Sequence, residues 1–454
     1  MRTPISFAAW QRVRRNHGAP GADGETVEAF DTEFSHRLPL LQAGLLAGTF
    51  CPKPVRAFEV KKESGGMRVL GIPTVTDRLV LQSLTHILTP LWEPSFSACS
   101  FAYRVGFHAH DAVAAAQRIL QTGLGWVVDL DIEKFFDNVD QVHLMQRLGL
   151  RLEDSRLLDL IADFLRCGQS WDGEIRPTRV GIAQGSPLSP LLANITLDEL
   201  DKEFERHGWP FVRYADDCIL FARTETEGRE ILAATDAFLQ ARLKLRLHPK
   251  KSRVVRPAEA DHLGFTFRLS RYGQVRRHAT REALDTFRQR IDELTRPHAG
   301  KNLESIIENV ATYARGWSLY YGFCQDGTLR TVRGYIRGRF RALAWEYWRS
   351  PEERCRQLQR LGLPAQDASR AAYELHLPDE VASLPVLAQA MPNAFFDRYG
   401  LGDKPAAKPK TTCRPSPTTT KSDPESQRLR RAIFEHLGWR LRLRPVPDWP
   451  FGRA

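Results

Sequence analysis

The chain has 454 residues, 42% of them hydrophobic and 26% charged, so it is globular and too long for one ordinary core, and we expect two or three domains. The formal net charge of +11 favours a polyanionic partner such as nucleic acid. No stretch approaches the roughly 18 apolar residues of a membrane-spanning helix, and the first residues lack a signal-peptide core, so we expect no membrane partner and a cytoplasmic location. The seven cysteines form no C-x-x-C pair, which argues against a zinc site and a disulfide framework.

The N-terminal part combines a basic helical pattern at Trp10–Arg15 with a β-hairpin pattern further on. Residues 55–73, VRAFEVKKESGGMRVLGIP, alternate as two strands around a turn at 63–66. Lys61, Lys62 and Arg68 lie near that turn, where flexible cations could close over a triphosphate. Basic hairpins are common, so an ordinary solvated hairpin is an equally open interpretation.

An apolar run at residues 125–139, GWVVDLDIEKFFDNV, predicts a strand interrupted by Asp129 and Asp131. A carboxylate inside an apolar strand is unfavourable unless it is paired or bound to metal. One such Asp could instead cap the helix that follows.

Residues 179–208 contain a Gly-Ser-Pro loop followed by an amphipathic helix pattern. We expect Ser186 to cap this helix with Pro187 at its first position. Gly185 would mark a close approach of two backbones, and Gln184 would point at a nucleotide. An ordinary proline-started core helix is the alternative.

The stretch Phe211–Ala222, FVRYADDCILFA, predicts two antiparallel strands with Asp216 and Asp217 as the tight turn between them. Adjacent like charges repel, and divalent cations are the commonest reason for a site to keep both ionised. For this stretch alone, a solvated Asp-Asp turn is the alternative interpretation. Together with Asp131, however, the pair could converge on two Mg²⁺ ions about 3.5–4 Å apart, as in nucleotidyl transfer to a 3′ hydroxyl.

The second half of the chain predicts a helix around 227–243, then alternating strands at 243–255 and 262–269 with Lys250 and Lys251 at a turn. Residues 280–359 follow a mostly helical pattern rich in arginine and aromatic residues. Such a pattern suits nucleic-acid backbones and stacked bases, although core packing is the better interpretation of any single ring. The arginines that we expect to contact phosphates are Arg315, Arg330, Arg333, Arg337, Arg339 and Arg341.

Several motifs, in order, make the sequence similar to the reverse transcriptases of bacterial group II introns. They are HGAPGADG, GGMRVLGIPTVTDRLV, DLDIEKFFDNVD, GIAQGSPLSPLLANITLDELD, VRYADDCILFA, HPKKSRVV and HLGFTF, followed by the maturase-like ARGWSLYYGF. The resemblance runs from about Asn16 to Gly402. It does not include the HNH endonuclease with cysteine pairs that ends larger members of the family. We therefore expect the chain to obtain its primer in another way.

The resemblance implies an α+β fold, a right-hand polymerase with fingers, an RRM-like palm and a helical thumb and maturase domain. The expected division is an N-terminal extension (1–50), fingers and palm (51–270), a thumb and maturase-like domain (271–401), a disordered linker (402–427) and a short basic C-terminal segment (428–454).

The resemblance also implies roles for individual residues. Asp131, Asp216 and Asp217 would bind the metal ions, with the backbone carbonyl of Ile132 beside them. Phe136 would block a 2′ hydroxyl, Lys62 and Arg68 would hold the triphosphate, Gln184 would lie against the incoming sugar and template, and Lys251 would be an acid for the leaving pyrophosphate.

The partners implied are an RNA template with its primer, deoxynucleotides, a group II intron RNA and a DNA target, and the cofactor is Mg²⁺ with Mn²⁺ as a substitute. Two alternatives stay open. One is a domesticated relative acting in DNA repair or phage defence; the other is an RNA-binding splicing cofactor. The chain departs from the usual family pattern at two places. Phe101–Gly106 replaces the usual YGFRPG, and Val60–Lys62 replaces the usual Ile-Pro-Lys. These departures bear on substrate preference more than on catalysis.

Overall fold

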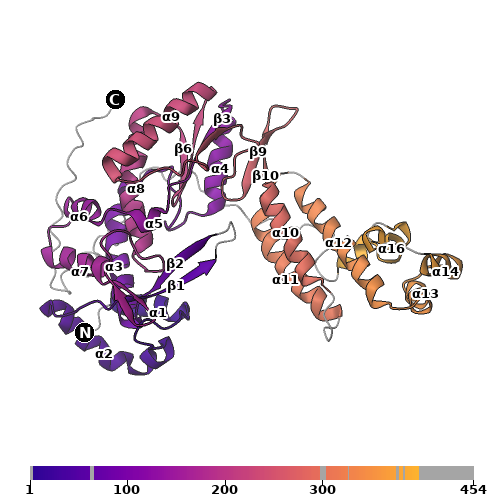
Figure 1. Cartoon of the computed structure of the whole chain (residues 1–454), viewed down its shortest axis with the longest axis horizontal. Coiled ribbons are helices and arrows are strands. Elements are labelled where there is room, and N and C mark those ends of the chain that lie inside the picture. Colours follow the sequence, from indigo (N-terminus) through magenta and orange to yellow (C-terminus); the bar gives the residue numbers. More distant parts are fainter. Residues whose placement is uncertain are drawn as a thin grey trace. The chain divides into compact units, whose positions relative to one another are not determined.

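The computed structural model describes residues 4–61, 66–296, 303–325, 327–374, 378–381 and 384–397. These residues form two compact units (Figure 1). The first contains the described chain up to Ile119 together with Leu124–Val255, and the second contains Leu120–Gly123 and the described residues from Arg256 to Asp397. Lys62 and the segments 402–427 and 428–454 lie outside the described residues.

The first unit mixes helices with two four-stranded sheets. In chain order its elements are α1 (Pro4–Arg15), α2 (Val27–Ala47), β1 (Val55–Lys61), β2 (Met67–Ile72), α3 (Val75–Trp92), the 3₁₀ turn η1 (Glu93–Ser95), α4 (Ala109–Leu120, whose last residue belongs to the second unit), β3 (Trp126–Leu130), α5 (Phe135–Asn138), α6 (Gln141–Gly149), α7 (Ser155–Arg166), β4 (Gln169–Trp171), β5 (Glu174–Arg176), α8 (Ser189–His207), β6 (Phe211–Tyr214), β7 (Asp217–Ala222), α9 (Glu225–Phe238), the π-helical turn η2 (Leu239–Leu243) and β8 (Arg253–Val255).

The central sheet of this unit has the strand order β6-β7-β3-β8 with every neighbouring pair antiparallel. One face buries alternate residues such as Val128, Leu130 and Leu220 in a core shared with α3, α6, α7, α8 and α9. In chain order the main elements are β3, α8, β6, β7, α9 and β8, so the expected βαββ order is present. The helix α9 packs on β3 and β8, where the bare α-carbon of Gly228 lets Val254 and Val128 approach.

The second sheet, β2-β1-β4-β5, holds the predicted β1–β2 hairpin. Its turn lies mostly outside the described residues, but the strands match the prediction, with Lys61 opposite Met67 at the open end. Helices α1, α2 and α3 pack beside it around Trp10, Phe30 and Leu79. The basic pattern at Trp10–Arg15 is therefore the last half of a real helix, α1.

The second unit begins with the hairpin β9 (Phe265–Leu269) and β10 (Val275–Ala279) and is helical after it. Its helices are α10 (Arg281–Leu294), α11 (Leu303–Tyr321), α12 (Thr328–Tyr347), α13 (Pro351–Arg360), α14 (Ala365–Tyr373), α15 (Pro378–Val381), α16 (Pro385–Ala390) and α17 (Asn393–Asp397). Aromatic rings fill its core as predicted: Trp317 stacks on Tyr321 with ring centroids 4.4 Å apart, and Trp345 is 5% exposed.

Two local predictions are wrong. The helix predicted to begin at Pro187, with Ser186 as its cap, begins two residues later, at Ser189. Ser186 and Pro187 belong to a preceding turn, closed by the N–H of Ser189 donating to the carbonyl of Ser186 at 3.2 Å, and Ser189 Oγ donates to the carbonyl of Ala183 at 2.7 Å. Residues 243–255 are not one continuous strand. Only Arg253–Val255 is a strand, and Leu247 forms an isolated bridge to Ile132.

Two further observations concern the whole chain. The compact units divide between Val255 and Arg256, so the hairpin β9–β10 belongs to the same unit as the helices that follow it. The expected boundary after residue 270 had instead assigned β9 to the fingers and palm. Among the described helices, none combines the length and the apolar character needed to cross a bilayer.

Candidate active site

The acidic hairpin has a two-residue turn, but the acidic pair is not that turn. Tyr214 pairs with Asp217 as the last rung between β6 and β7, so the turn residues are Ala215 and Asp216, and Asp217 is the first residue of β7. Ala215 has a φ of +59°, an uncommon conformation for a residue with a side chain and the one that a type II′ turn requires at this place. The turn therefore presents Asp216 at its tip and Asp217 at its base.

The strand register brings Asp131 to the same place. The pairs between β3 and β7 run from Trp126 opposite Ala222 to Leu130 opposite Cys218. The next residue on each side is Asp131 and Asp217, and antiparallel partners have α-carbons about 4.5–5.5 Å apart. Because β-strand side chains alternate between faces, the two carboxylates belong to the same face of the sheet.

The backbone carbonyl of Ile132 also faces this group. Ile132 bridges Leu247 on the other side of the chain, but the hydrogen bonds of that bridge are made by its neighbours, from Glu133 N to Arg246 O at 2.9 Å and from His248 N to Asp131 O at 2.7 Å. In this type of antiparallel pair the central residue turns its own N–H and C=O away from its partner. The carbonyl of Ile132 therefore points to the side of β7 and its turn.

The electrostatics agree with this convergence. Burial raises the pKa of the Asp216 carboxyl, and the nearby carboxylates of Asp217 and Asp131 raise it further, while the exposed Arg68 on β2 opposes them. Like charges that perturb one another in this way indicate a cluster that a cation would stabilise. Arg68, the predicted triphosphate contact, is thus close enough to the carboxylates to lower the pKa of Asp216.

Carboxylate and carbonyl oxygens are the donors that Mg²⁺ prefers, so the residues fit a divalent cation in kind. Within the described part of the chain, however, no three His, Cys, Asp or Glu side chains stand close enough together to hold a metal as they are. The Nζ atom of Lys251 lies 3.3 Å from Oδ2 of Asp131. A cation bound here would compete with this ammonium group for Asp131.

Phe136 and Gln184 lie beside the second sheet, β2-β1-β4-β5. Phe136 is half-buried and lines a cleft of about 240 Å³ with Val69, Gly181 and Ala183 among its other walls. Gln184 donates from Nε2 to Oδ1 of Asp137 at 3.4 Å. Both side chains are accessible enough to contact a substrate.

The Gly-Ser-Pro loop is held against the β1–β2 hairpin by its backbone. The N–H of Gly71 donates to the carbonyl of Gln184 at 2.7 Å. Gly185 has a φ of +112°, and a β-carbon there would lie 2.6 Å from the carbonyl oxygen of Gly71. The predicted close approach at Gly185 is confirmed, and it fixes the hairpin that carries Arg68 relative to Gln184.

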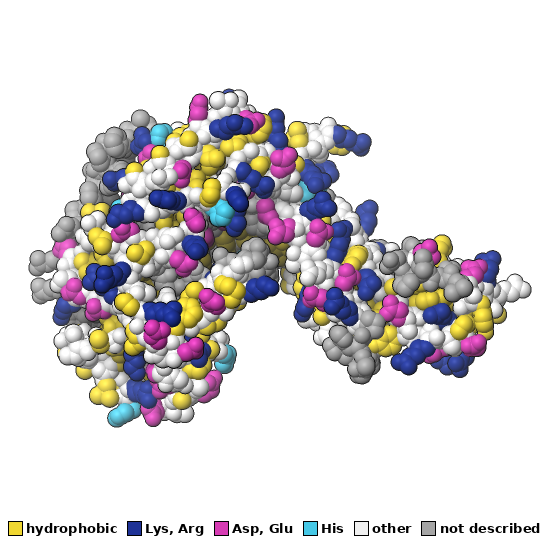
Figure 2. All heavy atoms as spheres, viewed as in Figure 1, with side chains coloured by type: hydrophobic (Ala, Val, Ile, Leu, Met, Phe, Trp, Pro, Cys, Tyr) yellow, Lys and Arg dark blue, Asp and Glu magenta, His cyan; other side chains and the backbone are white. Residues whose placement is uncertain are grey.

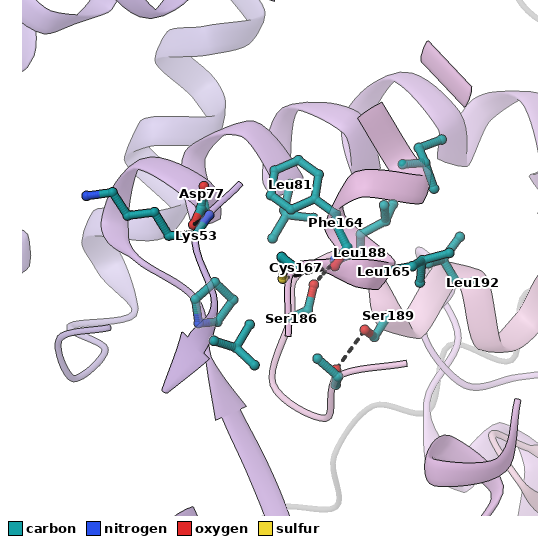
Figure 3. Close-up of a pocket in the computed structure, with 14 residues that line it drawn as sticks. Lys53, Asp77, Leu81, Phe164, Leu165, Cys167, Ser186, Leu188, Ser189 and Leu192 are labelled. Atoms are coloured by element: carbon teal, nitrogen blue, oxygen red, sulfur yellow. Dashed lines mark hydrogen bonds between the residues drawn. The ribbon is translucent and has the colours of Figure 1, made fainter. Parts of the chain in front are cut away.

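A smaller pocket of about 30 Å³ lies next to this loop (Figure 3). Figure 3 shows Asp77 beside Lys53 at one end and the apolar Leu81, Phe164 and Leu192 at the other. The backbone N–H of Lys53 donates to Oδ2 of Asp77 at 3.2 Å. The pocket has room for about one water molecule, so it belongs to the packing of the loop and is not a nucleotide site.

Known protein families match both units of the chain. Residues 60–267 match the family described as "Reverse transcriptase (RNA-dependent DNA polymerase)", and residues 284–362 match "Group II intron, maturase-specific domain".

The chain belongs to the group II intron reverse transcriptase/maturase family. Its first unit is accordingly a reverse transcriptase domain, which is an RNA-directed DNA polymerase. Members of this class depend on divalent metal ions, which agrees with the donor chemistry of the carboxylate cluster.

Three curated relatives illustrate the similarity. The "Protein YkfC" of Escherichia coli is 28% identical over 57% of this chain and 78% of its own length. The "Group II intron-encoded protein LtrA" of Lactococcus lactis is 37% identical over 44% of this chain and 34% of its own length. The "Putative COX1/OXI3 intron 2 protein" of Saccharomyces cerevisiae is 28% identical over 43% of this chain and 23% of its own length. The chain thus spans most of YkfC but about a third or less of the other two.

The arginines predicted to bind RNA in the maturase unit divide into two groups. Arg315 and Arg330 are exposed and Arg333 is half-buried. The other three are engaged: Arg337 is 7% exposed, Arg339 pairs with Asp292 at 3.1 Å, and Arg341 donates to the carbonyl of Met391 at 2.9 Å. Arg337, one of the arginines expected to contact phosphates, is therefore buried inside the unit.

Tyr103 is a site residue that the sequence reasoning missed. It has a φ of +62° and is 51% exposed. Partial burial raises the pKa of its hydroxyl, and the nearby Asp216 and Tyr214 raise it further, so the hydroxyl lies close to the acidic turn. The departure of Phe101–Gly106 from the usual family pattern was the available signal, because it places this hydroxyl-bearing ring in the loop.

Proposed function

We propose that this reverse transcriptase extends a primer on an RNA template by two-metal nucleotidyl transfer at Asp131, Asp216 and Asp217. The observation that carries the proposal is the convergence of these carboxylates and the Ile132 carbonyl at the end of β3 and the turn of the β6–β7 hairpin. Two Mg²⁺ ions, or Mn²⁺ in their place, would supply activation of the 3′ hydroxyl and charge neutralisation at the pyrophosphate.

The chain's own cations would handle the triphosphate. Arg68 is exposed on β2 and interacts with Asp216 through space, so it can reach phosphate oxygens beside the carboxylates. Lys62, which precedes the hairpin turn in the sequence, is proposed for the same task from its motif alone. Lys251 is proposed to donate a proton to the leaving pyrophosphate, and its Nζ atom, 3.3 Å from Oδ2 of Asp131, supports this role.

Deoxynucleotides are the proposed substrates because of Phe136. Its ring packs edge-on against the buried Phe135, with centroids 5.4 Å apart, and this contact limits how far it can turn away from a sugar. Gln184, bound to Asp137 and anchored through its carbonyl to Gly71, is proposed to lie against the sugar and template.

The helical unit is proposed to bind a group II intron RNA and to assist its splicing, with a DNA target as the eventual acceptor of the copy. The support is the match to the maturase-specific domain and the intron-encoded relatives. These matches favour this function over a role in DNA repair or phage defence, and the carboxylate cluster argues against a purely splicing cofactor. A cytoplasmic location stays a prediction of the sequence.

The direct experiment is extension of an end-labelled DNA primer on an RNA template with dNTPs and Mg²⁺. We expect full-length cDNA, none without template, and little extension when rNTPs replace dNTPs. A folded protein that leaves the primer unextended in both Mg²⁺ and Mn²⁺ would contradict the proposal. Splicing of a group II intron RNA with and without the protein tests the second activity separately.

A further inference from the structure

Arg213 in β6 is buried completely, with 0% of its surface exposed, which is rare for arginine. Its guanidinium forms a bidentate pair with Asp201 of α8, from Nε to Oδ1 at 2.7 Å and from Nη2 to Oδ2 at 2.5 Å. Asp201 is equally buried. A planar fork bound at two points to a carboxylate has one defined orientation, so the remaining nitrogen, Nη1, points in a fixed direction.

That direction is the acidic turn. Nη1 donates to the carbonyl of Ala215 at 2.9 Å and to Oδ1 of Asn194 at 3.0 Å. Ala215 is the left-handed residue that forms the turn together with Asp216. The guanidinium therefore holds, from inside the domain, the peptide that precedes the two metal-binding carboxylates of the hairpin.

The same residues hold the loop that carries Tyr103. The N–H of Arg213 donates to the carbonyl of Cys99 at 2.9 Å, and its carbonyl accepts from the N–H of Phe101 at 2.9 Å. Asn194 donates from Nδ2 to the carbonyl of Ala102 at 2.9 Å. The turn and the loop, far apart in sequence, are thus both hydrogen-bonded to the buried residues Arg213 and Asn194.

Stability is a poor explanation for this arrangement, because buried ion pairs are often replaceable by apolar residues of similar volume without loss of stability. Geometry is a better one, since groups that orient metal ligands affect metal affinity and rate although they touch neither metal nor substrate. We propose that Arg213, oriented by Asp201 and Asn194, is a positioning residue that fixes the Ala215–Asp217 turn so that Asp216 and Asp217 can bind divalent cations. The rate part of this inference rests on the proposed function, and the metal-binding part does not.

The test compares two changes at this pair with one matched control. The double variant Arg213→Met/Asp201→Leu removes both charges together, so that no unpaired charge is left buried. Arg213→Lys keeps the charge but lacks the two-point fork. The control is Arg206→Met/Glu203→Leu, an exposed ion pair on the same helix α8 with a separation of 2.6 Å. All are measured as full-length protein.

Three measurements are made on each variant: thermal unfolding, Mn²⁺ affinity by electron paramagnetic resonance without nucleotide, and kcat and KM in primer extension. For both Arg213 variants we expect folded protein that binds primer–template as the wild type does. We expect Mn²⁺ affinity to fall by about tenfold or more and kcat to fall by about a hundredfold, with little change in the KM for dNTP. The control should match the wild type in all three.

Wild-type Mn²⁺ affinity and kcat in the folded double variant would overturn the inference. So would losses that follow only the unfolding temperature and are regained on cooling, or failure of both Arg213 variants to fold, because each assigns the network to stability alone. If the wild type binds Mn²⁺ but extends no primer while the Arg213 variants still bind Mn²⁺ weakly, the proposed function fails and the positioning role stands.

Discussion

Phe136 is the residue on which the choice of sugar is proposed to depend. Its ring is half-buried against Phe135, so its replacement by alanine opens space at the cleft without emptying the core. We expect Phe136→Ala to incorporate ribonucleotides far better than the wild type while its rate with dNTPs falls only modestly. Single-nucleotide extension with dNTP and rNTP measures both rates. Equal discrimination by variant and wild type would place sugar selection elsewhere.

Asp77 is a buried carboxyl that makes stability depend on pH. It is 2% exposed, and burial raises its pKa to about 6. A carboxyl whose folded pKa lies above its unfolded value stabilises the fold when protonated. Its contribution is complete below about pH 4 and is lost as the pH rises through about 6.

Asp77→Asn should therefore stabilise the protein at pH 7 relative to the wild type, by about 1–3 kcal/mol, and much less at pH 4. The amide oxygen can still accept from the N–H of Lys53. Urea unfolding of both proteins between pH 4 and 8 measures the difference in their free energies of unfolding. Burial also raises the pKa of Asp198 to about 6, but both proteins contain Asp198, so its contribution cancels in that difference. A difference in stability that does not change with pH would contradict this account of Asp77.

Among the elements, the β6–β7 hairpin and β3 could be predicted from the sequence because apolar residues alternate around the carboxylates there. The start of α8 could not. Two Ser-Pro pairs, Ser186-Pro187 and Ser189-Pro190, each fit the local rules for a helix start, so the rules alone do not choose between them. The helix begins at the second pair, where Ser189 also donates to the carbonyl of Ala183 in the preceding loop.

The burial of Arg213 was equally hidden from the sequence. An arginine in a short strand beside a turn is usually solvated, and its partner Asp201 is on a helix that reads as an ordinary amphipathic one. Only the packing of α8 under the hairpin brings them together. Charge pairs between elements are set by tertiary structure, whereas carboxylates inside an apolar strand pattern are visible locally.

The substitution Gly185→Ala tests the contact between the Gly-Ser-Pro loop and the β1–β2 hairpin. An alanine there needs a left-handed φ and also collides with the carbonyl of Gly71. Gly173, with a φ of +92° and open space around it, is the matched control for the φ effect alone. We expect Gly185→Ala to lose about 1–3 kcal/mol more stability than Gly173→Ala and to raise the KM for dNTP, since Arg68 and Gln184 move. Equal effects of the two changes would mean that the close approach is unimportant.

At the scale of the whole molecule, the excess positive charge comes from the second part of the sequence: residues 1–255 contain 31 Lys and Arg against 32 Asp and Glu, whereas residues 256–454 contain 34 against 22. Figure 2 shows Lys and Arg side chains interspersed with Asp and Glu on this face rather than gathered in one field. RNA affinity should therefore depend on particular exposed arginines more than on net charge. Arg315 on α11 and Arg330 on α12 are the exposed ones among the six predicted.

Charge reversal at both positions, Arg315→Glu with Arg330→Glu, should weaken binding to group II intron RNA. Each lost phosphate contact should flatten the plot of log affinity against log salt by about 0.7–0.9. Extension of a short, saturating primer–template should change little. Arg229→Glu, at a 73% exposed side chain on α9, controls for the change of charge. An unchanged salt slope in the folded double variant would move the RNA surface away from α11 and α12.

The three carboxylates are proposed to perform the polymerase chemistry, and single-turnover kinetics separates this role from a role in binding RNA. The rate of single-turnover primer extension on RNA is compared for wild type, Asp131→Asn, Asp216→Asn and the control Asp159→Asn, an exposed carboxylate on α7, with RNA affinity measured in parallel. Our account predicts that the first two variants bind primer–template normally and lose extension by several orders of magnitude, and that the control keeps the wild-type rate. Substantial extension by folded Asp131→Asn or Asp216→Asn in Mg²⁺ would contradict it.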